Sequence, residues 1–372
     1  MVTCIKTLKV RIKDKHAGVL SQWAFDVNQV WNAGNELSAE YSRVPIPGVG
    51  YVNCGTSEYD LQKELKGIRK ERGLTIGAAT VQSVIAQHAK SRRQFKKNKL
   101  QWRASSGSKR ALGWIPFKAA GVKRVNGQIR FCGHIFGLWD SYDLSKYKLG
   151  TGSFSQDARG RWYFNTTVEV EVKPSEGRKS VGIDLGLKTV ATCSDGEKME
   201  RRRITDEFAL QLARAQRANK RQRVKAIHAR IKHCRQDAIH KFTTRLVENY
   251  GAIFVGHVSS KKLVKTRMAK SVLDAGWGSL KEQLRWKASA RSVVFEEVPE
   301  RNTTQTCSCC GEISANSPKG RAGLGIREWF CAECGTLHDR DVNAAKNILA
   351  LGHERLAVGI PVSFRVRTAA VG

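Results

Sequence analysis

The first regular pattern in the chain is an alternation of apolar and basic residues over 5–12, which predicts a half-buried β-strand. Apolar positions then recur at helical spacing over 15–43, 58–72 and 76–97, so three helical segments are expected. A stretch rich in Pro and Gly, 44–55, ends the first of them. The first hundred residues therefore combine one strand with a block of helices.

Strand-like segments return after a short Gly- and Ser-containing linker at 105–109. The clearest alternation runs from Trp162 to Val172, and turn signals such as Asn126-Gly127 separate the strands before it. The expected strands are 114–117, 128–132, 152–155 and 162–172. Together with the first strand they predict a small β-barrel, interrupted by the helical block.

From residue 181 onward, strands and helices alternate. The expected order is a strand hairpin, a third strand, a helix, a strand, a helix, a strand and a last helix, over 181–193, 199–204, 205–248, 252–258, 272–286, 292–298 and 341 onward. The helical segment 205–248 is expected to form one long helix or two shorter ones. This order is typical of a ribonuclease H-like fold. Residues 353–372 carry little pattern and are expected to form a tail.

Two Cys-x-x-Cys pairs, Cys307/Cys310 and Cys331/Cys334, are separated by about twenty residues, which is the ligand spacing of a Cys4 zinc ribbon. Two disulfides, or buried cysteines that share this spacing by chance, are the alternatives. Cys309 is a fifth thiol in the cluster and lies outside the ligand spacing.

One acid, Asp184, interrupts an apolar strand. Burying a carboxylate is costly unless it is paired or bound to a metal, so a site role is favoured over a hydrogen-bonded structural Asp. Gly182 and Gly186 on either side leave room for a close backbone or a nucleic-acid strand.

Two further acids, Asp339 and Asp341, precede the last helix. An Asp at this place is usually an N-cap, but one of the two is also a candidate ligand of a catalytic metal. Asp339 is the better candidate for the cap. In a ribonuclease H-like fold, Asp184 and Asp341 would meet over the sheet, where clustered carboxylates hold two Mg²⁺ ions about 4 Å apart.

The charge balance points to a polyanionic partner. Lys and Arg number 65 against 33 Asp and Glu, a formal net charge of +32, and 41% of the residues are hydrophobic, as in a globular protein. No apolar run long enough to span a bilayer and no signal peptide is apparent, so nucleic acid is favoured over an anionic membrane. The scattered remaining cysteines suit a reducing cytosol and one metal site better than a disulfide framework.

Two helical segments carry most of this basic character, and they are the expected nucleic-acid contacts. With Phe95 and Trp102 interleaved, the first suits phosphate tracking with base stacking, although a solvated face is the simpler alternative. The candidate residues are Lys90, Arg92, Arg93, Lys96, Lys97, Arg214, Arg217 and Arg221.

Three motifs, 181–188, 302–311 and 338–348, make the chain resemble the TnpB proteins of insertion sequences, the small relatives of type V CRISPR effector nucleases. Segments 112–118 and 160–164 extend the likeness toward the start of the chain. The resemblance implies an RNA-guided, Mg²⁺-dependent DNA endonuclease that cuts beside a short flanking motif and binds guide RNA and double-stranded DNA. The sequence leaves the oligomeric state open, with a monomer bound to its RNA as the preferred form. It also implies a multidomain α/β fold with the following parts: a wedge β-barrel (1–13 and 109–178), a helical recognition insert (14–108), a RuvC-type nuclease domain (179–306 and 335–352), a zinc ribbon (307–334) and a tail (353–372).

The sequence departs from the family at one catalytic position, where Gly256 stands in place of the usual Glu at the end of a strand. The favoured explanation is that the adjacent strand supplies the acid, since 295–300 contains Glu296, Glu297 and Glu300, of which the last two are the candidates. The expected catalytic set is therefore Asp184, Asp341 and Glu297 or Glu300.

Three alternatives remain open at this stage. A site lacking the acid would leave an RNA-guided DNA-binding repressor that does not cut, or the chain could be a guide-free accessory protein of a transposon. His257 beside Gly256 is a further candidate metal neighbour, although a His at such a place is more often structural.

Overall fold

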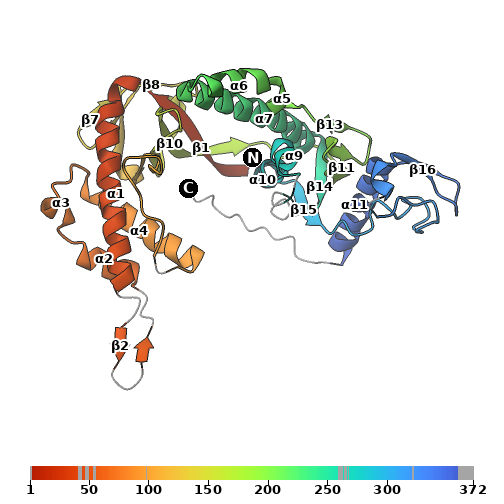
Figure 1. The fold of residues 1–372 in the computed structure, drawn as a ribbon, viewed down its shortest axis with the longest axis horizontal. Coiled ribbons are helices and arrows are strands. Elements are labelled where there is room, and N and C mark those ends of the chain that lie inside the picture. Colours follow the sequence, from red (N-terminus) through yellow and green to blue (C-terminus); the bar gives the residue numbers. More distant parts are fainter. Residues whose placement is uncertain are drawn as a thin grey trace. The chain divides into compact units, whose positions relative to one another are not determined.

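The computed structural model describes residues 2–40, 44–46, 50–52, 56–97, 99–258, 263, 266, 268–320 and 322–358. The chain divides into two compact units, one from Ile5 to Val170 and the other from Glu171 onward together with the first four residues (Figure 1). Each unit has its own hydrophobic core. Within the described residues, no helix combines the length and the apolar character needed to cross a membrane.

The unit Ile5–Val170 combines helices with β-sheets. Its longer helices are α1 (Ala17–Glu40), α2 (Glu58–Glu64), α3 (Ile68–Glu71) and α4 (Ala78–Phe95). Its strands are β1 (Val2–Ile12), β2 (Val44–Ile46), β3 (Gly50–Val52), β4 (Trp114–Phe117), β5 (Val122–Val125), β6 (Gln128–Phe131), β7 (His134–Phe136), β8 (Leu138–Trp139), β9 (Gly152–Gln156) and β10 (Trp162–Val172). They form a five-stranded sheet in the order β4-β9-β10-β1-β8, a three-stranded sheet β5-β6-β7 and the hairpin β2-β3.

Aromatic rings fill the core of this unit. Phe117 stacks on Phe164 with ring centroids 5.2 Å apart, and Phe154 packs against both rings. Trp23 of α1 packs edge-on against Phe136 of β7 at 5.6 Å, which joins the helices to the smaller sheet. The alternation of β10 therefore points its apolar face into a core shared by the helices and the strands.

The second unit is an α/β sandwich. Its sheet has the order β13-β12-β11-β14-β15, with β11 parallel to β14 and β14 parallel to β15. The strands are β11 (Lys179–Asp184), β12 (Thr189–Cys193), β13 (Lys198–Glu200), β14 (Tyr250–Gly256) and β15 (Val294–Val298). The helices are α5 (Ile204–Glu207), α6 (Ala209–Arg217), α7 (Arg221–Asn249), α9 (Ala269–Ala275), α10 (Trp277–Ala290) and α11 (Arg340–Ala357).

The two faces of this sheet have different partners, and the alternation along β14 assigns them. Ile253 and Val255 are buried in a cluster with residues of α7 and α10, whereas Ala252 and Phe254 are buried with Ile348 of α11 (Figure 1). Successive strand residues point to opposite faces, so even-numbered positions of β14 face α11. Residues 180, 182 and 184 of β11 share that face, because Gly182 is the register partner of Phe254.

Three elements differ from the sequence prediction. The helix expected over 272–286 is broken into α9 and α10 at Gly276, whose φ of 68° is left-handed. The third strand ends at Glu200, and Ile204 already begins α5. The expected tail starts too early, because α11 continues to Ala357; residues 359–372 lie outside the described part of the chain.

Candidate active site

Asp184 is the last residue of β11, the central strand of the sheet. It lies at the carboxyl end of the strand, on the face covered by α11. Burial, and after it the neighbouring carboxylates of Asp341 and Glu300, raise the pKa of its carboxyl group to about 7. Arg340 and the backbone N–H of Leu185 act in the opposite sense. Three acids that lie far apart in the sequence are therefore close enough in the fold to affect one another's ionisation.

The close packing of α11 on β11 explains how Asp184 and Asp341 meet. A Cβ atom at Gly182 would lie 2.1 Å from the carbonyl oxygen of Ala345, so only glycine allows this approach. Two residues along a strand span about 6.6 Å, and four residues along a helix span about 6 Å. Asp184 is two residues beyond Gly182 and Asp341 is four residues before Ala345, so these matched lengths bring the two acids together.

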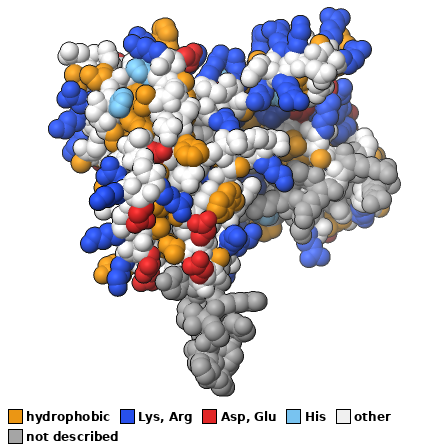
Figure 2. Space-filling model, turned by 60° about the vertical axis from the view of Figure 1, so that its left-hand side comes forward, with side chains coloured by type: hydrophobic (Ala, Val, Ile, Leu, Met, Phe, Trp, Pro, Cys, Tyr) orange, Lys and Arg blue, Asp and Glu red, His pale blue; other side chains and the backbone are white. Residues whose placement is uncertain are grey.

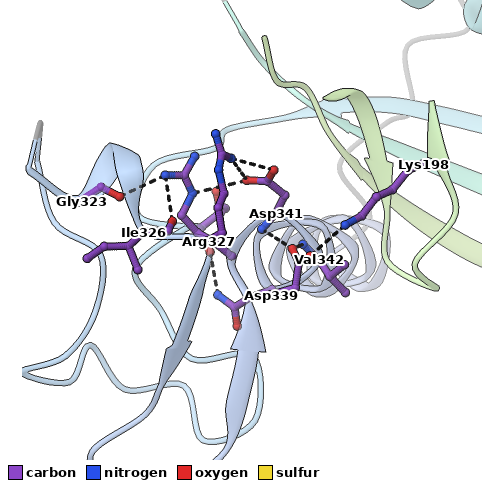
Figure 3. A network of polar contacts seen from close by, with 10 residues as sticks. Lys198, Gly323, Ile326, Arg327, Asp339, Asp341 and Val342 are labelled. Atoms are coloured by element: carbon purple, nitrogen blue, oxygen red, sulfur yellow. Dashed lines mark hydrogen bonds and ion pairs between the residues drawn. The ribbon is translucent and has the colours of Figure 1, made fainter. Parts of the chain in front are cut away.

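Asp339 caps the start of α11, as predicted. Its Oδ1 accepts hydrogen bonds from the backbone N–H groups of Asp341 (2.9 Å) and Val342 (3.0 Å), while its Oδ2 accepts one from Lys198 Nζ at 2.8 Å (Figure 3). Burial alone would raise the pKa of Asp339, but the bonds from Lys198 and the helix N–H groups outweigh it and lower the pKa. Asp339 thus fixes the first turn, which carries Asp341.

Asp341 is mostly buried, with 16% of its side chain exposed, and two arginines face it. Arg327 Nη1 lies 3.1 Å from Oδ2, and Arg340 Nε lies 3.4 Å from Oδ1 (Figure 3). Sequence reasoning missed Arg327, because nothing in the local pattern before the second cysteine pair indicates that its side chain turns toward the last helix. These cations balance the negative charge gathered around Asp341.

Glu300 occupies the space that the missing side chain at Gly256 leaves. Continuing the β11–β14 register by one residue places Gly256 beside Asp184, and Gly256 pairs in turn with Val298 of β15. A Cβ atom at Gly256 would lie 3.0 Å from Glu300 Oε2 and 3.0 Å from Ile348 Cδ1. Burial raises the pKa of Glu300, whereas His257 and Lys281 lower it. The structure thus brings Glu300 into the acidic group.

The structure places Glu297 outside this group, which corrects its candidacy. Glu297 pairs with Val255, so its side chain points to the α10 face of the sheet. There Oε2 accepts hydrogen bonds from Lys281 Nζ (2.8 Å), and Oε1 accepts one from Arg285 Nη2 (2.5 Å). Burial alone would raise the pKa of Glu297, but these cations and His257 lower it. Glu297 thus forms ion pairs on the α10 face of the sheet, opposite the α11 face on which Asp184 and Asp341 lie.

The remaining candidates near the sheet edge have structural partners. Glu296 lies on the α11 face and forms an ion pair with Arg355 of that helix. His257 is 63% exposed in its side chain, and its Nδ1 lies 3.1 Å from Glu297 Oε2. The imidazole therefore serves the Glu297 ion-pair cluster, and it affects Glu300 only through its charge.

Four cysteines converge in the ribbon. The sulfur atoms of Cys307, Cys310, Cys331 and Cys334 all lie within 4.8 Å of one another. Cys307 and Cys334 are 3.6 Å apart and Cys310 and Cys331 are 3.7 Å apart, close to the edge of about 3.8 Å that a tetrahedron of Zn–S bonds requires. Cys309 is exposed and is not part of this group. The donor set and its spacing suit a structural zinc ion.

Both cysteine pairs sit in the same kind of turn. The N–H of Cys307 donates to Glu312 O at 2.9 Å, and the N–H of Cys331 donates to Thr336 O at 2.9 Å. Each turn closes on a glycine in the left-handed region, Gly311 with φ 83° and Gly335 with φ 68°. This repeated backbone geometry presents two thiols of each pair toward the centre.

The candidate nucleic-acid contacts are exposed with one exception. Lys90, Arg93, Lys96 and Lys97 on and after α4 reach solvent, as do Arg214, Arg217 and Arg221 on α6 and α7. Basic side chains are spread widely over the face drawn in Figure 2. Arg92 corrects the prediction, because its side chain is buried and its Nη1 donates to the hydroxyl of Thr56 at 2.7 Å. Arg92 thus ties α4 to the segment before α2.

Comparisons with known proteins match most of the second unit. Residues 277–348 match the family described as "Cas12f1-like, TNB domain", and residues 163–267 match the family described as "Probable transposase". A "Putative RNA-guided DNA endonuclease" of Streptomyces pristinaespiralis is 34% identical over 227 residues, which are 56% of this chain and 54% of that protein. A "Putative RNA-guided DNA endonuclease InsQ" of Escherichia coli strain K12 is 28% identical over 230 residues, 54% of this chain and 56% of that protein.

More distant matches include a protein named TnpB-like and a solved structure with a similar fold. A "TnpB-like protein L79" of Acanthamoeba polyphaga mimivirus is 24% identical over 233 residues, 55% of this chain and 43% of that protein. The matched segments span about half the length of these curated relatives. A cryo-EM structure of a Cas12f1–sgRNA–target DNA complex aligns with a TM-score of 0.58 at 13% identity, over 93% of this chain and 98% of that chain, which is a likeness of fold alone.

Proposed function

Because the chain belongs to the TnpB family, we propose that it is an RNA-guided DNA endonuclease whose acidic site hydrolyses phosphodiester bonds with divalent metal ions. The observation that supports this most directly is the grouping of Asp184, Asp341 and Glu300 at the carboxyl edge of a sheet. Carboxylate oxygens suit Mg²⁺. A raised pKa like that of Asp184 is typical of a carboxyl group in a functional site.

In this proposal Glu300 takes the place of the family's strand-end glutamate. Gly256 supports it, because the space beside its Cα is where the Glu300 carboxylate lies. Glu300 reaches this place from the segment that follows the neighbouring strand β15, which ends at Val298, so the acid changes its origin in the sequence but keeps its place beside Asp184. The proposed site is RuvC-type in this respect, with a ligand supplied by this segment instead of by the end of β14.

The side chains have separate tasks in the proposed mechanism. Asp184, Asp341 and Glu300 supply the anionic oxygens that hold the cations, and Asp339 keeps the first turn of α11 in place for Asp341. The bound Mg²⁺ ions would activate water and stabilise the leaving oxygen of the phosphodiester. Arg327 and Arg340 partly neutralise the carboxylates and lie where a phosphate could also bind them.

The partners follow from the charge and the family. Guide RNA and double-stranded DNA are the proposed partners, and the net charge of +32 would attract their phosphates. Base pairing with the guide would supply the sequence specificity. A zinc ion in the Cys4 ribbon is proposed as a structural element.

Asp184→Ala and Asp341→Ala test the site. We expect both variants, loaded with guide RNA, to shift target DNA in a gel as the parent protein does and to leave plasmid DNA uncut in Mg²⁺. Glu354→Ala, on the exposed side of the same helix as Asp341, is the matched control and should cut normally. Cutting by either Asp variant would remove the site assignment.

The same experiment separates two other functions. A parent protein that shifts target DNA without cutting it would be a guided repressor. A preparation from which no RNA can be extracted would point to a guide-free accessory protein of the transposon.

A further inference from the structure

The first Cys-x-x-Cys turn is bound by two asparagines of α11. Asn343 Nδ2 donates to Thr306 O at 2.7 Å, and its Oδ1 accepts the backbone N–H of Ser308 at 2.8 Å. Asn347 Nδ2 also donates to Thr306 O at 2.7 Å and to Thr303 O at 2.8 Å. Asn343 is only two residues beyond Asp341, so this turn is fastened to the part of the helix that carries the acid.

The second Cys-x-x-Cys turn is connected to the same part of the helix by the backbone. It joins strands β16 (Glu328–Phe330) and β17 (Leu337–Asp339), and β17 runs directly into α11 through the cap Asp339. The residue before β16, Arg327, contacts Asp341, and its carbonyl accepts the N–H of Arg340 at 2.7 Å. The first turn of α11 is therefore held between the two halves of the ribbon.

One side chain bridges these halves. His338 of β17 places its Nε2 3.0 Å from Sγ of Cys307, which belongs to the opposite half. The imidazole is buried, and its ring centroid lies 4.9 Å from that of Trp329 on β16. Only Cys307, Trp329 and Cys331 form a buried cluster here among the described residues. A buried cluster of three side chains contributes little stability, so a bound metal is needed to hold the two halves together.

We propose that the metal ion of the ribbon sets the position of Asp341, and that His338 is the positioning residue that couples the two by donating its Nε2–H to the metal-bound thiolate of Cys307. The four sulfur atoms lie within 4.8 Å of one another, but they do not join the two halves of the ribbon unless a cation binds all four. A bound metal would supply four such bonds and close both halves on the first turn of α11. The N–H···S bond removes charge from the sulfur and orients it, which is the usual task of a group one step outside a metal's ligands.

Hydrogen exchange on the full-length protein tests the coupling. We expect removal of zinc by a chelator, followed by dialysis, to speed exchange of the Asp341 and Val342 amides by about tenfold or more, because their acceptor Asp339 loses its fixed place. Exchange in β14 is the internal control and should not change, since its hydrogen bonds lie within the sheet. Unchanged protection at Asp341 and Val342 after complete loss of zinc would overturn the proposal.

A pair of variants tests His338 itself. His338→Phe keeps a ring against Trp329 and removes the donor, whereas His338→Gln keeps an N–H donor. We expect the Phe variant to lose zinc to a chromogenic chelator at a concentration about 10- to 100-fold lower than the parent, and the Gln variant to retain much of the affinity. With Co²⁺ in the ribbon, the sulfur-to-cobalt absorption band should shift in the Phe variant, because the thiolate loses its hydrogen bond. Parent-like zinc affinity and an unshifted band in the Phe variant would overturn the role of His338.

The inference rests on the proposed function only in taking Asp341 as a ligand of the acidic site. A Mn²⁺ titration followed by electron paramagnetic resonance separates the two. Mn²⁺ binding that Asp184→Ala abolishes, and that zinc removal weakens, supports both proposals. Mn²⁺ binding that is insensitive to Asp184→Ala would refute the acidic site, while the exchange and chelator results would still decide the coupling.

Discussion

At the scale of single residues, the protonation of the acidic site depends on how far each carboxyl group is removed from water and on the charges beside it. Asp184 has lost much of its water and has two other acids beside it, and both effects favour its protonated form. Glu297 has nearly the same position in the sequence as Glu300, yet it meets only cations. Each pKa unit corresponds to about 1.4 kcal/mol, so these surroundings distinguish Asp184, the proposed cation ligand, from Glu297, which is held in ion pairs.

The raised pKa of Asp184 predicts a pH-dependent response to divalent cations. In the metal-free protein the carboxyl group holds its proton up to about pH 7 but would release it near 3.8 when unfolded. Its contribution to stability is therefore present below about pH 4 and is lost as the pH rises toward 7. A divalent cation must displace that proton, so we expect Mn²⁺ to raise the melting temperature more at pH 8 than at pH 5.5.

The control for this measurement is Asp184→Asn, which carries no proton to displace. In that variant the rise in melting temperature with Mn²⁺ should be small and equal at both pH values. Equal shifts at the two pH values in the parent protein would contradict the assignment of the raised pKa to a cation ligand.

Glu300→Gln and Glu297→Gln form a matched pair that distinguishes the two acids of the β15 segment. We expect Glu300→Gln to reduce target cleavage by about 100-fold or more, because it removes an anionic ligand and keeps the shape. Glu297→Gln should lower thermal stability, because it leaves Lys281 buried beside a neutral partner, but should cut at a rate close to that of the parent. Initial rates on a plasmid carrying the target measure both. A greater loss of cleavage in the Glu297 variant would reverse the assignment.

At the scale of elements, the alternation of the strands decides which acids meet. The segments of β1, β10, β11, β14 and β15 were predictable because apolar periodicity is a local property. Asp184 and Asp341 were also predictable as candidates, since an acid in an apolar strand and an acid at a helix start are visible in sequence. The same alternation places the side chain of Glu297 on the opposite face of the sheet from those of Glu296 and Glu300. To assign the faces from the sequence, one would have to know that Val298 pairs with Gly256.

What the sequence could not supply is the register between elements that are distant in the chain. The approach of Ala345 to Gly182 and the reach of Arg327 to Asp341 depend on how α11 and the ribbon pack, and no local pattern encodes that. The break at Gly276 was missed for a related reason, because a single glycine in a helical pattern is often tolerated and only its left-handed φ marks the break.

A swap between neighbouring strands tests the role of Gly256. We expect Glu300→Ala to abolish cleavage and the double variant Gly256→Glu/Glu300→Ala to regain part of it, because the new carboxylate would project into the space that Glu300 vacates beside Asp184. Gly256→Ala/Glu300→Ala is the control, which fills the backbone position without an acid and should stay inactive. Cleavage rates in Mg²⁺ measure the recovery, and a double Glu/Ala variant as inactive as the control would contradict a shared place for the two acids.

At the scale of the whole molecule, the net charge of +32 predicts that the proposed binding to nucleic acid weakens steeply as the salt concentration rises. Composition is enough for this prediction, because net charge does not depend on the fold. Composition does not say which cations face solvent, and Arg92 and Arg93 show the difference within one turn of α4. The guanidinium of Arg92 donates hydrogen bonds to the carbonyl and hydroxyl oxygens of Thr56. The side chain of Arg93 is exposed and forms no ion pair with any described residue.

Arg92→Ala and Arg93→Ala therefore have opposite expected effects. If Arg93 contacts a phosphate, its replacement lowers affinity for RNA or DNA of any sequence, and it reduces by about one the slope of log affinity against log salt concentration. Arg92→Ala should leave that slope unchanged and lower the melting temperature, because Thr56 loses a buried charged donor worth about 1 to 3 kcal/mol. Filter-binding titrations between 50 and about 200 mM salt measure the slope, and thermal unfolding measures the stability. A reduced slope for Arg92→Ala, with an unchanged one for Arg93→Ala, would show that burial in α4 is a poor guide to which cations reach the nucleic acid.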